Sequence, residues 1–389
     1  MFHFTTLPPL SLYIHIPWCV RKCPYCDFNS HQIRGDMPET DYVTALFADL
    51  EQDLPSVWGR TVRSIFIGGG TPSVLSPEAI YHLLSGVRAR LAVVANAEIT
   101  LEANPGTVDC TRFCGFREAG INRLSLGIQS FNDTTLQHLG RIHGRKEAIA
   151  AIEMATQVGF DNINLDLMFG LPAQTVEAAL DDLRMAVTFQ PCHLSWYQLT
   201  IEPNTLFYHQ PPPLPDDDLL WDMQIAGQRY LAEQGYLQYE VSAYAKPGWR
   251  CQHNLNYWQF GDYLGIGAGA HGKISDASLG TITRLSKQRH PHTYLESAHT
   301  GAVVTNCTTL RVDDVSLEFM MNALRLLEGF TNQEFTENTG LSMVCIEKPL
   351  QQAYARGWLV KESNGAQPRI RATETGMRFL DEVLGLFVP

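Results

Sequence analysis

Apolar residues recur at two different spacings between residues 11 and 200. Short apolar runs, typical of buried strands, alternate with stretches that are apolar every three or four positions, as on one face of a helix. The pattern predicts strands at 11–16, 64–67, 98–102, 123–127, 162–168 and 194–199, and helices at 41–54, 77–91, 109–119, 145–158 and 176–189. Strands that alternate with helices predict an α/β fold with a parallel sheet covered by helices. About six such units fit an open doubly wound sheet or a full or partial barrel.

The pattern changes after residue 210, where Gln210-Pro-Pro-Pro-Leu-Pro215 is too rich in proline for a helix interior or a central strand. Residues 216–233 then predict a helix with an acidic first turn, and residues 236–244 predict one strand. From about residue 312, helical stretches at 314–327, 333–338 and 346–355 precede strand candidates at 358–361 and 369–372. This order predicts a winged-helix-like module. We therefore expect a core at 1–210, an aromatic-rich extension at 211–310 that completes the barrel region, and a C-terminal domain at 311–389.

Composition and charge narrow the class of protein. The 389 residues are 45% hydrophobic and 18% charged, which is ordinary for a globular chain, and the formal net charge is −12. A negative charge, repeated in the C-terminal domain with 8 basic and 11 acidic residues, argues against nucleic acid as a partner. No apolar run of about 18 residues appears, and the first ten residues lack the features of a secretory signal. We therefore expect a cytoplasmic protein.

Three of the nine cysteines, Cys19, Cys23 and Cys26, crowd into eight positions directly after the first predicted strand. Three thiolates from one tight loop suit iron–sulfur chemistry, in which each thiolate binds one iron. A cluster with four irons then keeps one iron open for a small chelating ligand. Structural zinc is the alternative, and because zinc normally takes four protein ligands, His15 or His31 would be the fourth.

The Cys-x3-Cys-x2-Cys motif, with an aromatic residue before its last cysteine, resembles the radical S-adenosylmethionine (SAM) superfamily. The segment Tyr13-Ile-His-Ile-Pro-Trp-Cys19 is similar to the branch of oxygen-independent coproporphyrinogen III oxidases and their relatives. Five further segments agree with that branch, at residues 68–72, 102–105, 125–131, 139–143 and 164–172. The resemblance implies a partial (β/α)6 radical SAM barrel, a [4Fe–4S] cluster on the three cysteines, and SAM on the open iron.

The same resemblance implies which residues bind SAM. Glu102 would meet the SAM ammonium, Arg141 would pair with its carboxylate, and Asp166 would suit the ribose hydroxyls. The remaining expected SAM contacts are Tyr13, Gly69, Gly70, Thr71 and Gln129. Taken singly, each of these residues has an ordinary alternative role, such as a surface salt bridge, a helix cap or a core hydrogen bond. Their placement at successive strand ends favours a shared site.

Two features separate the oxidases from the haem chaperones of the HemW group. The oxidases share a fourth cysteine, two residues after the third cysteine of the motif. This chain has Phe28 at that position. Residues 253–258 match the His-Asn-x-x-Tyr-Trp motif that is associated with haem binding in the HemW group. The resemblance implies His253 as an axial ligand of haem b, with Tyr257 and Trp258 as flat apolar faces. The alternative is a hydrogen-bonded core histidine; His271 is a weaker ligand candidate.

The function implied by the resemblance is that of a haem chaperone. Such a protein holds haem b and SAM, carries a [4Fe–4S] cluster, and delivers haem to haem-requiring, respiratory proteins. The alternative is an oxygen-independent coproporphyrinogen III oxidase, which uses SAM for the oxidative decarboxylation of propionates in porphyrin metabolism. Phe28 and the haem motif favour a protein without that oxidase activity. Haem-accepting proteins are the expected partners, while docking at the membrane and a homodimer are left open.

Overall fold

The computed structural model describes residues 2–363 and 367–388. Its largest element is a sheet of 12 strands in the order β14-β13-β12-β11-β1-β4-β5-β6-β7-β8-β10-β9. The seven strands from β11 to β8 are parallel neighbours. Their bounds are β1 (Leu10–Ile16), β4 (Thr61–Gly69), β5 (Ala92–Ala103), β6 (Arg123–Gln129), β7 (Asn162–Phe169), β8 (His193–Gln198) and β11 (Asp262–Ile266).

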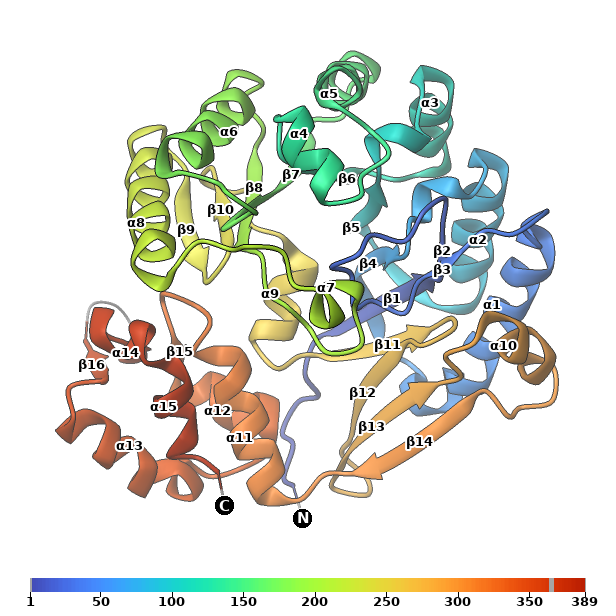
Figure 1. Ribbon diagram of the computed structural model, residues 1–389. Helices are drawn as coiled ribbons and strands as arrows, with labels where there is room; N and C mark the ends of the chain where they lie inside the picture. Colours follow the sequence, from blue (N-terminus) through green and yellow to red (C-terminus); the bar gives the residue numbers. More distant parts are fainter. Residues whose placement is uncertain (1, 364–366, 389) are drawn as a thin grey trace.

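The strands β1, β4, β5, β6, β7 and β8 follow one another both in the chain and in the sheet, which confirms the predicted partial (β/α)6 barrel. Figure 1 shows them in an arc with helices on its outer side. The helices that follow the strands are α1 (Glu39–Asp53), α2 (Pro77–Arg90), α3 (Cys110–Ala119), α5 (Arg145–Val158) and α6 (Val176–Thr188). The observed bounds of these helices agree closely with the predicted ones. Two strands differ, because β4 and β5 extend well beyond their predicted ranges.

Local sequence explains where the helices begin. The side chains of Ser76, Asp109 and Thr175 accept hydrogen bonds from backbone N–H groups in the first turns of α2, α3 and α6. The apolar faces of the helices then pack on strands whose side chains are buried on both faces. In the register of the sheet, Ile14 of β1 lies between Ile67 of β4 and Ile266 of β11. This core holds the carboxyl ends of the parallel strands in place.

The extension departs from the predicted pattern in two places. The single strand predicted at 236–244 is wrong, because the chain forms β9 (Leu237–Glu240) and β10 (Ala243–Ala245), which are antiparallel. The Glu240 carboxylate stabilises the turn between them by accepting hydrogen bonds from the backbone and hydroxyl of Ser242, both at 3.2 Å. At the other edge, β12 (His271–Asp276), β13 (Thr281–Lys287) and β14 (Val304–Thr309) add antiparallel strands that were not predicted.

The C-terminal part has its own hydrophobic core, and its elements follow the predicted order except for one additional short strand between the first two helices. Helices α11 (Val312–Ala323), α12 (Asn332–Thr339) and α13 (Glu347–Ala355) pack beside a three-stranded sheet. Its strands are β15 (Phe330–Thr331), β16 (Leu359–Glu362) and β17 (Arg369–Ala372). The N-terminal Phe2 is buried in the same hydrophobic cluster, and Figure 1 shows the N-terminus beside this part of the molecule.

The remaining elements complete the structure. They are β2 (Trp18–Cys19), β3 (His31–Gln32), α4 (Asp133–His138), α7 (Leu206–His209), α8 (Asp217–Glu233), α9 (Gln252–Trp258), α10 (Pro291–Ala298), α14 (Glu374–Arg378), α15 (Leu380–Gly385), and 3-10 turns at Leu54–Val57, Pro72–Val74, Pro105–Thr107 and Met343–Ile346. Asp216 caps α8, as the predicted helix at 216–233 implies. Within residues 2–363 and 367–388, each helix is too short or too polar to cross a bilayer.

Candidate functional site

The loop with the three cysteines is tied firmly to the barrel. Cys19 is the last residue of β2, and Cys23 and Cys26 lie in the loop that follows. The Lys22 ammonium closes this loop by donating hydrogen bonds to the carbonyls of Phe28 and Ser30, both at 3.2 Å. A second anchor reaches across the sheet, because the Asn29 side chain donates to the Ala268 carbonyl at 2.8 Å. The loop therefore holds its thiols in a defined place.

A cavity of about 470 Å³ opens at the carboxyl ends of the parallel strands, where α/β barrels place their active sites. All three cysteines line it. So do seven of the residues expected to contact SAM: Gly69, Gly70, Thr71, Glu102, Gln129, Arg141 and Asp166. Tyr13 does not line this cavity but an adjoining one, which also has Gly69 and Glu102 in its wall. The structure thus brings most of the predicted site residues together.

The glycines after β4 are needed because the chain passes very close to β1 and the cysteine loop. Gly69 has a φ of +125°, and a Cβ atom there would lie 2.7 Å from the Ile16 carbonyl oxygen. A Cβ atom at Gly70 would lie 2.7 Å from the carbonyl oxygen of Trp18, the residue before Cys19. Both distances are shorter than the contacts that Cβ atoms make with non-bonded atoms in proteins. The glycines therefore permit a close approach of backbone to backbone at this edge of the sheet.

Glu102 is a half-buried carboxyl group that lacks a cationic partner within hydrogen-bonding distance among the described residues. Its Oε2 accepts one hydrogen bond, from the Gly69 N–H at 3.1 Å. Burial and the nearby Asp166 carboxylate raise the pKa of Glu102 to about 8. A bound ammonium group would compensate the Glu102 carboxylate for the water that burial removes, and would thereby favour its ionised form. The site therefore suits a ligand that carries a positive charge at this point.

Arg141 supplies the opposite charge. Its Nη2 donates to the Gly127 carbonyl at 2.7 Å, and its Nη1 lies 3.6 Å from the sulfur of Cys23. Its Nε is buried without a hydrogen-bond partner in the described part of the chain. A half-buried guanidinium with a free N–H fits a carboxylate ligand. Glu102 and Arg141 together match the ammonium and carboxylate of an amino acid.

Asp166 and Gln129 are held by neighbouring polar side chains. The Asp166 carboxylate accepts hydrogen bonds from Ser125 and from Asn164, each at 2.8 Å. Burial nevertheless raises its pKa. Gln129, with a φ of 69°, accepts from the Tyr197 hydroxyl at 2.7 Å. Sequence reasoning missed Tyr197 and Ser125. Ser125 lies on β6, the strand that also carries the predicted Gln129, whereas β8, which carries Tyr197, contributes no predicted residue.

The three thiols fit an iron–sulfur cluster better than a single ion. Burial raises the pKa of Cys19 and of Cys26, so their thiolates need a metal to compensate. In the described ranges, no three His, Cys, Asp or Glu side chains converge on one metal ion. In a [4Fe–4S] cluster each thiolate binds its own iron, so such convergence is not required. His15, a candidate fourth zinc ligand, has both ring nitrogens engaged, with Tyr13 at 3.0 Å and the Asn29 carbonyl at 2.8 Å.

The expected haem motif lies on α9, and its three side chains point to different places. His253 is 1% exposed, with Nδ1 3.0 Å from the Ser64 hydroxyl and Nε2 3.3 Å from the Tyr257 hydroxyl. Burial and the Arg123 guanidinium lower the pKa of His253 to about 3. This conformation is the core histidine that the sequence left as the alternative, so axial ligation by His253 stays a prediction that requires α9 to move. Trp258 lines the cavity that holds the three cysteines, and Tyr257 lines the adjoining one.

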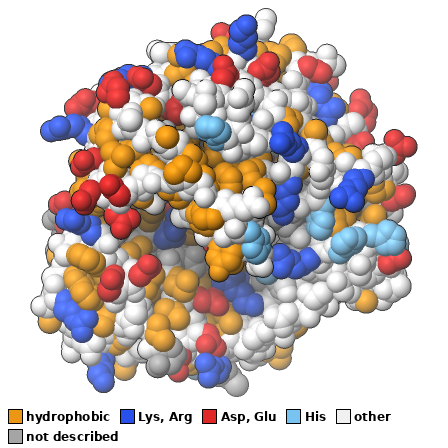
Figure 2. Space-filling model, in the orientation of Figure 1, with side chains coloured by type: hydrophobic (Ala, Val, Ile, Leu, Met, Phe, Trp, Pro, Cys, Tyr) orange, Lys and Arg blue, Asp and Glu red, His pale blue; other side chains and the backbone are white. Residues whose placement is uncertain are grey.

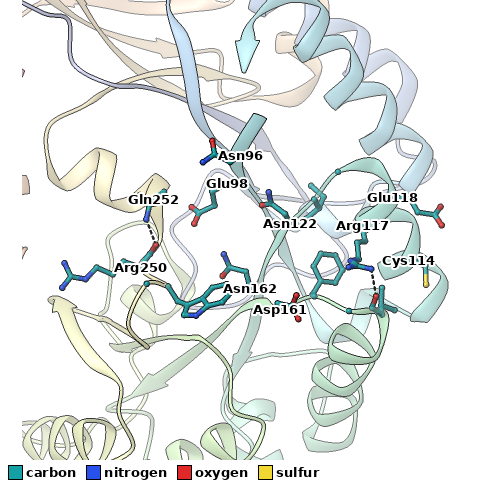
Figure 3. Close-up of a pocket in the computed structure, with 17 residues that line it drawn as sticks. Asn96, Glu98, Cys114, Arg117, Glu118, Asn122, Asp161, Asn162, Arg250 and Gln252 are labelled. Carbon is teal, nitrogen blue, oxygen red and sulfur yellow. Dashed lines mark hydrogen bonds between the residues drawn. The ribbon is translucent and has the colours of Figure 1, made fainter. Parts of the chain in front are cut away.

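A more voluminous cavity, about 820 Å³, lies near the opposite ends of the strands (Figure 3). Its wall includes Asn96 and Glu98 in β5, Asn162 at the start of β7, and Arg250 before α9. It contains none of the predicted site residues and lies on the side of the barrel away from the cysteines. We therefore place the chemistry in the smaller cavity.

Known proteins with this geometry agree on the class. The Radical SAM superfamily model matches residues 13–186, and the HemN C-terminal domain model matches residues 310–379. The solved structure of coproporphyrinogen III oxidase (HemN) from Escherichia coli superposes with a TM-score of 0.81 and 24% identity, covering 98% of this chain and 90% of that one. This likeness shows the fold, and the chain is a radical SAM protein.

Relatives narrow the class to one family. "Heme chaperone HemW" from Escherichia coli K12 is 53% identical, over 98% of this chain and 99% of the relative. A protein of the same name from Haemophilus influenzae is also 53% identical, over 98% of each chain. "Radical S-adenosyl methionine domain-containing protein 1, mitochondrial" from Mus musculus is 34% identical, over 97% of this chain and 87% of the relative. The chain belongs to the HemW family.

Proposed function

We propose that this protein is a haem chaperone that binds haem b and SAM, carries a [4Fe–4S] cluster and delivers haem to haem-requiring proteins. Identity of 53% over nearly the full length to relatives named heme chaperones supports the proposal. The observation that carries its SAM and cluster part is one cavity that holds three cysteines, an uncompensated Glu102 and an unpartnered Arg141 Nε.

The roles of the cavity residues follow from their chemistry. Cys19, Cys23 and Cys26 would hold the cluster, which supplies an iron with an open position for SAM. Glu102 would bind the ammonium, Arg141 the carboxylate, and Asp166 the ribose hydroxyls. Gly69, Gly70, Thr71 and Gln129 would complete the wall, and Tyr13 would support it from the adjoining cavity.

Haem would bind beside the SAM cavity rather than within the barrel core. Tyr257 and Trp258 offer aromatic surface toward the two cavities, while His253 is enclosed between them. Figure 2 shows hydrophobic side chains gathered in the middle of this face, next to Lys, Arg and His side chains. Such a surface suits a ligand that is apolar and carries negative propionate groups.

Phe28 bears on the alternative function. Its side chain is 59% exposed and lines both the cavity with the cysteines and the adjoining cavity. The oxidases share a cysteine at this position. We therefore propose that the chain lacks coproporphyrinogen oxidase activity. We further propose a cytoplasmic location, haem-accepting proteins as partners, and the division into units at 1–210, 211–310 and 311–389.

The test is anaerobic reconstitution followed by three measurements on one preparation. Iron and sulfide content should reach four of each per chain, calorimetry should detect SAM binding, and haem titration should saturate. Loaded protein should then transfer haem to a haem-free acceptor protein. A reconstituted protein that carries the cluster and binds SAM but takes up no haem would overturn the chaperone function.

A further inference from the structure

A row of buried polar side chains crosses the interior of the barrel. Ser125, Asn164 and His193 are paired across the neighbouring strands β6, β7 and β8 in the register of the sheet. Tyr239 of β9 extends this row, and all four side chains are buried. Burying so many polar groups is costly unless each one is hydrogen-bonded. We call these four residues the polar row.

The polar row is one continuous series of hydrogen bonds that ends on Asp166. The Tyr239 hydroxyl lies 2.8 Å from His193 Nε2, and His193 Nδ1 lies 2.6 Å from Asn164 Oδ1. The Asn164 amide donates to the Asp166 carboxylate at 2.8 Å and to the Ser125 hydroxyl at 2.7 Å. Ser125 in turn donates to the other oxygen of Asp166 at 2.8 Å. Asp166 lines the cavity that holds the three cysteines, so the row connects the barrel interior to that cavity.

The direction of each hydrogen bond follows from the carboxylate at the end of the row. An ionised carboxylate only accepts, so Asn164 presents its NH₂ group to Asp166 and its carbonyl oxygen to His193. A carbonyl oxygen also only accepts, so the imidazole proton lies on Nδ1, and Nε2 accepts from the Tyr239 hydroxyl. Burial and the Arg123 guanidinium hold the pKa of His193 well below its usual range, so the ring carries this single proton. The donors of the polar row therefore all run toward Asp166.

This arrangement determines what Asp166 can recognise. The row supplies one donor to each of its two oxygens, which fixes the plane of the carboxylate. These hydrogen bonds oppose the effect of burial on the pKa of Asp166 and favour its ionised form. Hydrogen bonds aligned in one direction also polarise and strengthen one another. A carboxylate has about four acceptor positions, so two remain for a ligand that donates, such as a pair of hydroxyl groups.

We propose that His193 is a positioning residue, which acts through Asn164 to hold Asp166 in the orientation that accepts hydrogen bonds from the ribose hydroxyls of SAM. The inference rests on the proposed binding of SAM and adds to its site a residue that is not among the described residues lining the cavity. Tyr239 fixes the tautomer of His193 from the far end of the polar row.

The test uses two ligands to separate positioning of Asp166 from general support of the fold. Reconstituted full-length protein is titrated by calorimetry with SAM and with 2′,3′-dideoxy-SAM, which lacks both ribose hydroxyls. His193→Leu removes the donor to Asn164 and should weaken SAM binding roughly 2- to 10-fold, the range of one hydrogen bond. Its affinity for the dideoxy analogue should equal that of the parent, because the analogue has no hydroxyl from which Asp166 could accept.

His193→Asn tests rescue by a conservative change. Its amide nitrogen is separated from Cα by the same number of bonds as Nδ1 of histidine, so it can still donate to Asn164. This variant should recover most of the preference for SAM over the dideoxy analogue. If it keeps the low preference of His193→Leu, the donor at Nδ1 is not what holds Asp166, and the inference falls.

Tyr239→Phe is the milder variant, which keeps the inference testable if His193→Leu does not fold. It removes only the hydroxyl that donates to His193, and it should lower the preference for SAM in the same direction. Tyr236→Phe is the matched control, because it removes another buried hydroxyl, one that donates to the Pro191 carbonyl at 2.7 Å outside the polar row. This control should keep the preference of the parent.

Two results would overturn the inference while the proposed function stands. Equal losses of affinity for both ligands in His193→Leu would show that His193 only supports the fold. The preference of the parent in both His193→Leu and Tyr239→Phe would show that the polar row does not act on Asp166. A parent protein that binds neither ligand would instead overturn the proposed binding of SAM, and this inference with it.

Discussion

The Cζ atom of Arg325 lies 4.4 Å from the centroid of the Trp258 indole ring. The same guanidinium donates to the Glu240 carboxylate at 3.1 Å. Arg325 belongs to the C-terminal part, whereas Trp258 and Glu240 line the cavity that holds the three cysteines. The C-terminal part therefore supports the wall of the site from behind.

Arg325→Ala should weaken both the fold and the site. It removes a cation–π contact and leaves Glu240 buried without its cation, which together cost about 1–3 kcal/mol of unfolding free energy. We expect a lower melting temperature and weaker SAM binding. Arg378→Ala is the matched control, because the Cζ atom of Arg378 lies 4.3 Å from the centroid of the Trp221 ring. Equal SAM affinities in both variants would contradict a role for Arg325 in the site.

Replacing Cys19, Cys23 or Cys26 by alanine should abolish the cluster. Each thiolate binds one iron, and no other cysteine lines the cavity among the described residues. Iron and sulfide analysis and the EPR spectrum of the reduced protein measure the loss. Cys345→Ala, at an exposed cysteine, is the control and should retain the cluster. An intact four-iron cluster in all three site variants would disprove the assignment.

SAM affinity should rise with pH toward about 8. The carboxyl of Glu102 is protonated below its pKa of about 8, so binding of an ammonium must displace that proton. Glu102→Gln should lower affinity roughly 10- to 150-fold at pH 8 and flatten this rise. Calorimetry from pH 6 to 8 measures both effects. Glu233→Gln, an exposed residue at the end of α8, should behave as the parent.

The same shift affects the stability of the ligand-free protein. The folded chain keeps the Glu102 proton up to about pH 8, whereas the unfolded chain releases it near 4.5. Folding therefore binds a proton between these values, and the contribution of Glu102 to stability falls as pH rises through that window. Thermal melts should show a smaller loss of melting temperature in Glu102→Gln. An identical pH dependence in both proteins would show that Glu102 does not titrate in this way.

Gly70→Ala should displace the cysteine loop. Its Cβ atom would lie 2.7 Å from the Trp18 carbonyl oxygen, and backbone atoms cannot yield cheaply. We expect about 1–3 kcal/mol of destabilisation and reduced iron content. Gly385→Ala, where no atom lies within 4 Å of the new Cβ, should keep both properties. Full iron content in Gly70→Ala would show that the loop tolerates the shift.

Much of the barrel and of the candidate site could be predicted from the sequence, for physical reasons. Buried parallel strands give apolar runs, and the helices between them give a regular stripe, so their order was evident. Residues at strand ends, such as Glu102, Gln129 and Asp166, converge because the carboxyl ends of parallel strands share one edge.

Other features depend on contacts that no local pattern encodes. The strands β12 to β14 are partly exposed and polar, so they lack the apolar runs of the barrel strands. The sequence motif identified His253 but could not show which face of α9 carries it. The His253 side chain is buried because it packs against Phe66 and Ser64. The glycines after β4 were identified, while their close approach to Ile16 and Trp18 required the structure.

The most direct test of the account is one competition measurement. Reconstituted protein is incubated anaerobically with SAM, a reductant, and equal amounts of haem and coproporphyrinogen III, and the tetrapyrroles that are bound and released are identified by chromatography. The account predicts haem bound to the protein and coproporphyrinogen III unchanged. Accumulation of protoporphyrinogen IX, with no haem on the protein, would contradict it and show that this chain is an oxidase.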